Sequence, residues 1–334
     1  MNKAIEIKKL GVIETINSSV PYSQDPTSVF HTLCENKTDS LLLESAEIES
    51  KQNLTSLLLI DSAVRIVCRG HEVTFQALTQ NGQALIEHLT QNVKADIKSD
   101  LTDNLLTLTF VEPSNELDED SRLREASSFD ALRLVQHSFE QDPSNKHALF
   151  MAGLFAYDIV ANFEPLGDAE ATNKCPDFVF YVAETLLRFD HQEHEGLLHA
   201  SLFAQDDSIK AQLTDRLADI QTQCQSLKAI TEVTPLDNVE AVPSVSDEEF
   251  CQTVRNLKEY VVKGDVFQVV PSRRFTLPCP APLAAYKELK QSNPSPYMFY
   301  MQDELFTLFG ASPESALKYA TSRSTPSRAQ SLNT

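Results

Sequence analysis

The chain has 334 residues, of which 48 are acidic and 28 are basic, and its formal net charge is −20. This acidic surplus excludes a protein that binds nucleic-acid backbones or anionic membranes, because both functions need clustered lysine and arginine. With 42% hydrophobic residues, no apolar run of the ~20 residues that cross a bilayer and no signal-peptide pattern at the N-terminus, the sequence predicts a cytoplasmic protein of about two domains.

The first clear pattern along the chain is a group of strands over residues 54–78, in which Asp61-Ser62 separates two apolar segments. Asn81-Gly82 follows and predicts a turn, and the residues after it predict a short helix at 84–89. Further strands are predicted at 106–111, 149–157, 178–189 and 197–203, and helices at 128–139 and 208–227.

Residues 229–245 are predicted to link two domains, because they contain prolines and scattered acids and have no periodicity. A helix begins directly afterwards, since Ser246 and Glu249 form a capping box and Gly264 suits its left-handed C-terminal cap. Beyond it, strands are predicted at 266–270, 297–301 and 305–309, and a helix at 283–290. The irregular order of strands and helices favours an α+β fold with mixed or antiparallel sheets flanked by helices.

The residues alone give few candidates for chemistry, because the chain has no P-loop, no H-E-x-x-H and no G-x-S-x-G motif. Arg273-Arg274, beside a predicted strand end, suit a ligand that carries a carboxylate. Glu314 lies on a tight turn at the end of another predicted strand, where functional groups are common. Taken alone, such features are more often solvated or salt-bridged surface residues than functional groups.

Several segments carry a resemblance to a known family. Residues 265–275 read DVFQVVPSRRF, 293–299 read NPSPYMF and 308–315 read LFGASPES, while 41–46 read LLLESA and 153–158 read GLFAYD. Together they resemble anthranilate synthase component I, a family of chorismate-utilising enzymes, over about residues 20–319.

The resemblance implies an enzyme of tryptophan biosynthesis that converts chorismate and glutamine-derived ammonia into anthranilate and pyruvate. It implies Mg²⁺ as the cofactor, a glutamine amidotransferase subunit as the partner and tryptophan as a feedback inhibitor. It also implies the anthranilate synthase component I fold, with a regulatory domain at 1–228, a linker at 229–245 and the start of a chorismate-utilising domain at 246–320.

Carried onto this sequence, the family's tryptophan pocket corresponds to Glu44, Ser45, Pro296, Tyr297 and Met298. An indole favours apolar and polarizable side chains such as tyrosine and methionine, while its ammonium group favours polar oxygens. From the sequence alone, Ser45 is an equally good helix N-cap.

The resemblance also implies two catalytic residues. Gln268 stands where relatives that add water have a lysine base, and neutral ammonia is nucleophilic without such a base. Glu314 corresponds to the family's acid that protonates the departing ring hydroxyl as ammonia adds.

The sequence departs from the family pattern after residue 320, where residues 321–334 form a polar tail. Family members continue with a chorismate contact, the glutamate ligands of Mg²⁺ and an active-site histidine. Codons for the family's Ile-Tyr-Pro-Ile-Ala-Gly-Thr, read one base later, give Ser-Thr-Pro-Ser-Arg-Ala-Gln, which is residues 324–330. We therefore expect that the reading frame shifted near Arg323, that the metal ligands are missing and that this chain is inactive alone. The alternatives are a residual tryptophan-binding module and a subunit-docking or misfolding remnant with open sheet edges.

Overall fold

The computed structural model describes most of the chain, in two compact units. The larger unit groups residues 1–230 with 286–334, and the smaller one holds 231–285. No helix of the described part is long and apolar enough to cross a membrane. The described residues are 10–35, 37–45, 54–111, 118, 121, 125–140, 145, 147–162, 175–230, 239–315, 317–320 and 323–325. Most of the predicted polar tail therefore lies outside the described residues.

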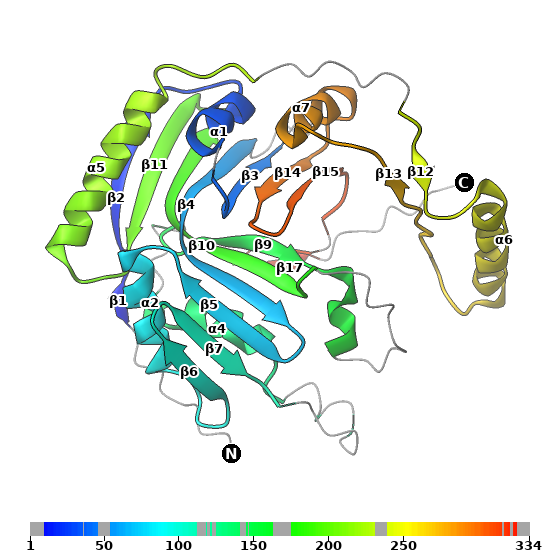
Figure 1. Cartoon of the computed structure of the whole chain (residues 1–334), viewed down its shortest axis with the longest axis horizontal. Helices are drawn as coiled ribbons and strands as arrows, with labels where there is room; N and C mark the ends of the chain where they lie inside the picture. Colours follow the sequence, from blue (N-terminus) through cyan, green and yellow to red (C-terminus); the bar gives the residue numbers. More distant parts are fainter. Residues whose placement is uncertain are drawn as a thin grey trace. The chain divides into compact units, whose positions relative to one another are not determined.

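The larger unit contains an eleven-stranded sheet in which every described pair is antiparallel (Figure 1). Its main path runs β15-β14-β3-β4-β10-β11-β2, while β5 pairs with β4 and continues to β7 and β6, and β9 pairs with β10. The strands are β2 Glu14–Val20, β3 Ser40–Glu44, β4 Thr55–Arg69, β5 Glu72–Ala77, β6 Lys98–Thr102, β7 Leu105–Thr109, β9 Met151–Phe155, β10 Phe178–Asp190, β11 Glu195–Leu202, β14 Tyr297–Gln302 and β15 Thr307–Ser312.

Helices lie against this sheet, so the predicted α+β fold with antiparallel strands flanked by helices is confirmed (Figure 1). They are α1 Pro26–Cys34, α2 Gln80–Thr90, α4 Phe129–His137, α5 Asp207–Gln223 and α7 Pro282–Ser292, with a 3₁₀ turn at Tyr157–Asn162. Two short strand pairs complete the unit, β1 Leu10–Val12 with β8 Phe139–Glu140 and β16 Lys318–Ala320 with β17 Arg323–Thr325.

The long strand β10 divides the hydrophobic core between two faces of the sheet. Phe178 and Val182 join a cluster that includes residues of α2 and α4. Val179 and Tyr181 point to the opposite face and join a second cluster, because successive side chains of a strand alternate. Both faces are therefore buried, which explains why β4 and β10 read as nearly continuous apolar runs.

The expected break at Asp61-Ser62 is wrong, because β4 continues through both residues. Ser62 Oγ donates a hydrogen bond to the backbone oxygen of Asp39 at 2.6 Å. The Asp61 carboxylate accepts hydrogen bonds from Arg216 and Thr185. Since partners distant in the sequence satisfy both polar side chains, the strand does not need to end there.

The expected turn at Asn81-Gly82 is also wrong, because these residues form the first turn of α2. Thr79 caps the helix, and its hydroxyl accepts from the Gly82 N–H at 3.0 Å. Asn81 is 1% exposed, and its side-chain oxygen accepts from the N–H groups of Phe203 and Ala204 at 2.7 and 3.1 Å. The dipeptide thus anchors the start of α2 against the sheet.

We expect Gly82→Ala to lower the free energy of unfolding by about 2–3 kcal/mol. A Cβ at Gly82 would lie 1.9 Å from the backbone oxygen of Ala63, so helix and strand would have to separate. Gly11→Ala is the control, because nothing lies within 4 Å of a Cβ there. Urea unfolding of both variants measures the difference, and equal midpoints for the two would contradict this account of the contact.

The smaller unit consists of α6 Asp247–Lys263 and the strand pair β12 Val242–Pro243 and β13 Phe275–Thr276. The predicted capping box of Ser246 and Glu249 is confirmed, as is Gly264 in the left-handed region with φ of 82°. No residue of α6 is buried, although Arg273 packs over the rings of Phe250 and Phe275.

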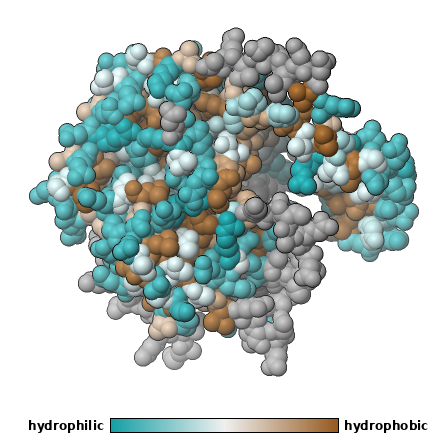
Figure 2. Space-filling model, in the orientation of Figure 1, coloured by the Kyte–Doolittle hydropathy of each residue, from teal (hydrophilic) through white to brown (hydrophobic). Residues whose placement is uncertain are grey.

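The predicted strand at 266–270 is wrong, because this segment of the smaller unit has no regular structure. A strand needs a neighbour to satisfy its backbone groups, and no described strand pairs with this one. Phe267 and Val270 are exposed as a result. Hydrophobic surface is visible on this unit (Figure 2).

The domain boundaries predicted from the sequence stay predictions.

Candidate functional site

The segments predicted to bind an inhibitor meet on neighbouring strands. Strand β3 pairs with β14 in antiparallel register, and Glu44 lies directly opposite Met298. Ser45 follows β3, while Pro296 and Tyr297 lie at the start of β14. The structure therefore brings these five residues, which are far apart in the sequence, to one end of a single strand pair.

The Glu44 carboxylate is buried, with 2% of its side chain exposed, and three hydrogen-bond donors surround it. Tyr286 and Thr27 donate from their hydroxyls to Oε2 at 2.6 and 3.2 Å. Lys290 Nζ lies 2.6 Å from Oε1 and neutralises the charge. Burial and the neighbouring Glu44 carboxylate raise the pKa of Tyr286, so its hydroxyl stays a donor. Glu44 thus ties α1 and α7 to β3.

Aromatic rings fill the space beside this carboxylate. Tyr300 lies 5.7 Å from Phe30, 5.5 Å from Tyr286 and 6.0 Å from Phe309, measured between ring centroids. Met298 is 1% exposed and, two residues before Tyr300 on the strand, faces the same side of the sheet. The site therefore joins one buried carboxylate to an apolar, polarizable wall.

Tyr297 differs from the other predicted inhibitor contacts. Because side chains alternate along β14, it faces the side of the sheet opposite Met298, and it is 42% exposed. Ser45 and Pro296 are half-buried at the strand ends. Glu44 and Met298 consequently form the buried part of the candidate site.

The two predicted catalytic residues are exposed and lie in different units. Gln268 belongs to the irregular segment of the smaller unit. Glu314 follows β15 in the larger unit, where its backbone oxygen accepts a hydrogen bond from Ser312 Oγ at 2.9 Å. The roles of Gln268 and Glu314 stay predictions.

Sequence reasoning missed the partners of Glu44. Tyr286 and Lys290 are four residues apart on α7, which places them on one face of that helix. This spacing was readable in the sequence. It could not reveal that the face is directed at a carboxylate on β3, because that contact joins positions separated by 242 residues or more.

The described residues do not fit a magnesium ion. No three His, Cys, Asp or Glu side chains among them lie close enough together to hold a metal. Mg²⁺ requires several oxygen ligands in near-octahedral geometry.

Comparison with known proteins places the chain in a family. The family described as "chorismate binding enzyme" matches residues 100–325. The chain belongs to this chorismate binding enzyme family. The resemblance inferred from the sequence motifs is therefore confirmed.

Relatives within the chorismate binding enzyme family share much of the sequence. Anthranilate synthase component 1 of Vibrio parahaemolyticus is 69% identical over 321 residues, which are 96% of this chain and 59% of the relative. The protein of the same name from Escherichia coli K12 is 50% identical over 318 residues, or 93% of this chain and 60% of the relative. The chain thus spans about three fifths of the length of these relatives.

The fold is similar to a solved structure of the same kind. The crystal structure of anthranilate synthase component I from Streptococcus pneumoniae TIGR4 matches with a TM-score of 0.50 at 20% identity. The match covers 82% of this chain and 54% of that one. At this identity the similarity supports the fold alone and does not establish the function.

Proposed function

We propose that the chain derives from component 1 of an anthranilate synthase, an enzyme that makes anthranilate and pyruvate from chorismate and ammonia and is inhibited by tryptophan, and that this chain does not catalyse the reaction alone. The ammonia would come from a glutamine amidotransferase subunit. High identity to component 1 proteins supports this proposal. The observation that carries it is the pairing of Glu44 with Met298, which brings together the two segments that the resemblance assigns to tryptophan binding.

The chemistry of this site suits an aromatic amino acid. Met298 and the rings around Tyr300 offer the apolar contacts that an indole favours. Glu44 offers a carboxylate to the ligand's ammonium group. Since Lys290 already occupies Oε1 and its side chain is 25% exposed, the ligand's ammonium would exchange with that of Lys290, which can turn toward solvent.

The catalytic roles follow from the type of reaction. Ammonia adds to a ring carbon of chorismate while the ring hydroxyl departs, and loss of pyruvate then makes the ring aromatic. Glu314 would give its proton to the departing hydroxyl. Gln268 would contact the incoming ammonia without taking a proton from it.

We expect the purified chain to bind tryptophan in saturable fashion. The chain contains no tryptophan, so the added ligand is the single indole and its emission shift and anisotropy report binding directly. Met298→Ala should weaken the affinity at least tenfold, because it removes the buried wall opposite Glu44. Met151→Ala on β9 is the matched control and should leave the affinity unchanged. Titration without saturation at millimolar tryptophan would contradict the proposed site.

We expect no anthranilate from this chain with chorismate, ammonium and Mg²⁺. The segment around Gln268 is exposed and unpaired, and the described residues hold no metal site. Anthranilate fluorescence gives a sensitive assay, and measurable product would overturn this part of the proposal. Tryptophan binding without product would support a regulatory site in a chain that does not catalyse alone.

A subunit-docking remnant is the second candidate, and the smaller unit favours it. Helix α6 has no buried residue, and Val262 on this helix and Phe267 after it are almost fully exposed. Such apolar surface on a soluble chain marks an interaction site or an aggregation risk. Limited proteolysis separates the two candidates, because a remnant without a tryptophan site would gain no protection from added tryptophan.

A further inference from the structure

A separate cavity with polar and apolar walls lies between helices α2 and α5 and strands β4 and β10. Its volume is about 290 Å³, enough for a small organic molecule. Polar side chains of Asp61, Thr79, Glu184 and Arg216 line one part of it. Ile209 and Leu213 of α5 form an apolar part. The cavity contains none of the residues assigned to anthranilate formation or to tryptophan.

Glu184 enters this cavity because of a β-bulge. On β10, Ala183 pairs with Ser62 and Thr185 pairs with Asp61, so Glu184 between them has no partner residue on β4. A bulge of this kind redirects a side chain and is frequent beside functional sites. Burying a carboxylate in the middle of a long strand is costly, so its partners decide what it can do.

The Glu184 carboxylate is only half satisfied. Glu184 is 8% exposed, and its Oε1 accepts from Thr79 Oγ1 at 2.6 Å and from Asn81 Nδ2 at 3.1 Å. Oε2 has no hydrogen-bond partner among the described residues and is not sealed from solvent. An oxygen acceptor that lines a cavity is therefore available to a ligand.

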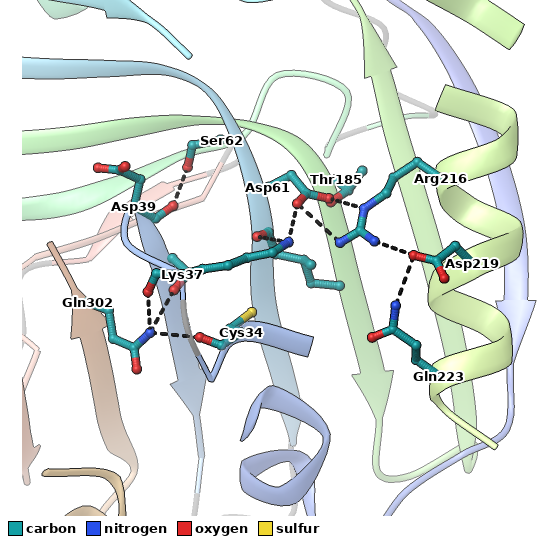
Figure 3. A network of polar contacts seen from close by, with 12 residues as sticks. Cys34, Lys37, Asp39, Asp61, Ser62, Thr185, Arg216, Asp219, Gln223 and Gln302 are labelled. Carbon is teal, nitrogen blue, oxygen red and sulfur yellow. Dashed lines mark hydrogen bonds and ion pairs between the residues drawn. The ribbon is translucent and has the colours of Figure 1, made fainter. Parts of the chain in front are cut away.

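The cations beside the cavity are already used. Arg216 Nε and Nη2 donate to the Asp61 carboxylate at 2.9 and 3.2 Å, and its Nη1 donates to Asp219 at 2.6 Å (Figure 3). Lys37 also pairs with Asp61 (Figure 3). The two cations balance the two aspartates, and no cation among the described residues forms an ion pair with Glu184.

The pKa of Glu184 is consistent with a buried carboxylate that has no ion-pair partner among the described residues. Burial is the largest influence on the pKa of Glu184 and raises it, and the neighbouring Asp61 raises it further. Hydrogen bonds from Thr79 and Asn81 and the charge of Arg216 lower it, but the pKa stays above its ordinary value. A cation bound at Oε2 would favour the charged carboxylate.

We propose that the cavity binds a small organic monocation with N–H donors, an alkylammonium, whose charged head donates to Glu184 Oε2 and whose apolar body contacts Ile209 and Leu213. The unbalanced negative charge selects a cation over an anion. A metal ion is disfavoured, because no three suitable ligands meet among the described residues. This proposal is independent of the function proposed above.

Isothermal titration of the full chain with butylammonium chloride tests it. We expect saturable binding of one butylammonium ion per chain. Glu184→Gln should weaken binding at least tenfold, since it removes the charge and keeps the shape. Glu87→Gln, the same change at an exposed position of α2, should leave binding unchanged.

Two further measurements make the test decisive. Ile209→Phe fills the apolar part of the cavity and keeps the Glu184 carboxylate, so it should also abolish binding. This variant supplies the test if Glu184→Gln fails to fold. Tetramethylammonium has the same charge but no N–H donor, and should bind at least tenfold more weakly than butylammonium. Absence of wild-type binding, equal affinity of Glu184→Gln, or equal affinity for tetramethylammonium would each overturn the proposal.

Discussion

Replacing Arg65 with methionine is expected to lower the free energy of unfolding by about 3–5 kcal/mol. Arg65 on β4 donates to both carboxylate oxygens of Asp303, from Nε at 2.9 Å and from Nη2 at 2.8 Å. Tyr181 on β10 donates to the same carboxylate at 2.5 Å. The Asp303 side chain is 0% exposed, so the variant would leave a buried charge without its cation.

The pH dependence of the stability of Arg65→Met gives an independent test of the Arg65–Asp303 ion pair. Burial alone would raise the pKa of Asp303, but hydrogen bonds from Arg65 and Tyr181 outweigh it and lower that pKa below its ordinary value. The pair therefore stabilises the wild type above about pH 4, the unfolded value, and this contribution is lost as pH falls through the folded pKa. In Arg65→Met, burial raises the pKa of Asp303 instead. The stability difference between the two proteins should narrow on acidification.

Urea unfolding at neutral and acidic pH measures both effects. Arg133→Met is the control, because its ion pair with Asp130 is exposed and should contribute less than about 1 kcal/mol. Arg65→Met with Asp303→Leu should cost less than Arg65→Met alone, since it removes the unpaired charge. An Arg65→Met variant as stable as Arg133→Met would show that the buried pair does not hold the β14–β15 turn to β4.

Features set by neighbours in the sequence were predictable. The capping box at Ser246 and Glu249 and the left-handed Gly264 depend on contacts within a few residues, so local rules suffice. The errors at Asp61-Ser62 and Asn81-Gly82 have the opposite origin. There, Asp61 and Asn81, whose residue types usually end strands or make turns, are satisfied by partners more than 100 residues away.

In the candidate site, too, some features were predictable from the sequence and others depend on contacts between distant residues. Glu44 and Met298 were identified by resemblance, and the register of β3 with β14 places them side by side. Lys290 was invisible to the sequence, because its importance depends on where α7 packs. The failed strand at 266–270 shows the same limit, since the intrinsic preference of a segment cannot make a strand without a neighbour to pair with.

Lys290→Met is the second substitution with a large expected effect, a loss of about 3 kcal/mol in the free energy of unfolding. It leaves the buried Glu44 carboxylate without a cation, although Tyr286 and Thr27 still donate to it. Lys287→Met, one turn away on α7, has no described ion pair and should change stability by less than about 0.5 kcal/mol. Adding Glu44→Gln to Lys290→Met should restore stability, because the amide keeps an acceptor for Tyr286 and removes the charge.

The same variants decide whether Glu44 receives a ligand's ammonium group in exchange for Lys290. If it does, Lys290→Met removes an internal competitor, and the folded variant should bind tryptophan at least fivefold more tightly than the wild type. Glu44→Gln should weaken binding, while Lys287→Met should leave it unchanged. A purely structural Glu44–Lys290 pair predicts instead that Lys290→Met alters stability alone. Unchanged tryptophan affinity in folded Lys290→Met would therefore refute the exchange while leaving the ion pair as a fastening between β3 and α7.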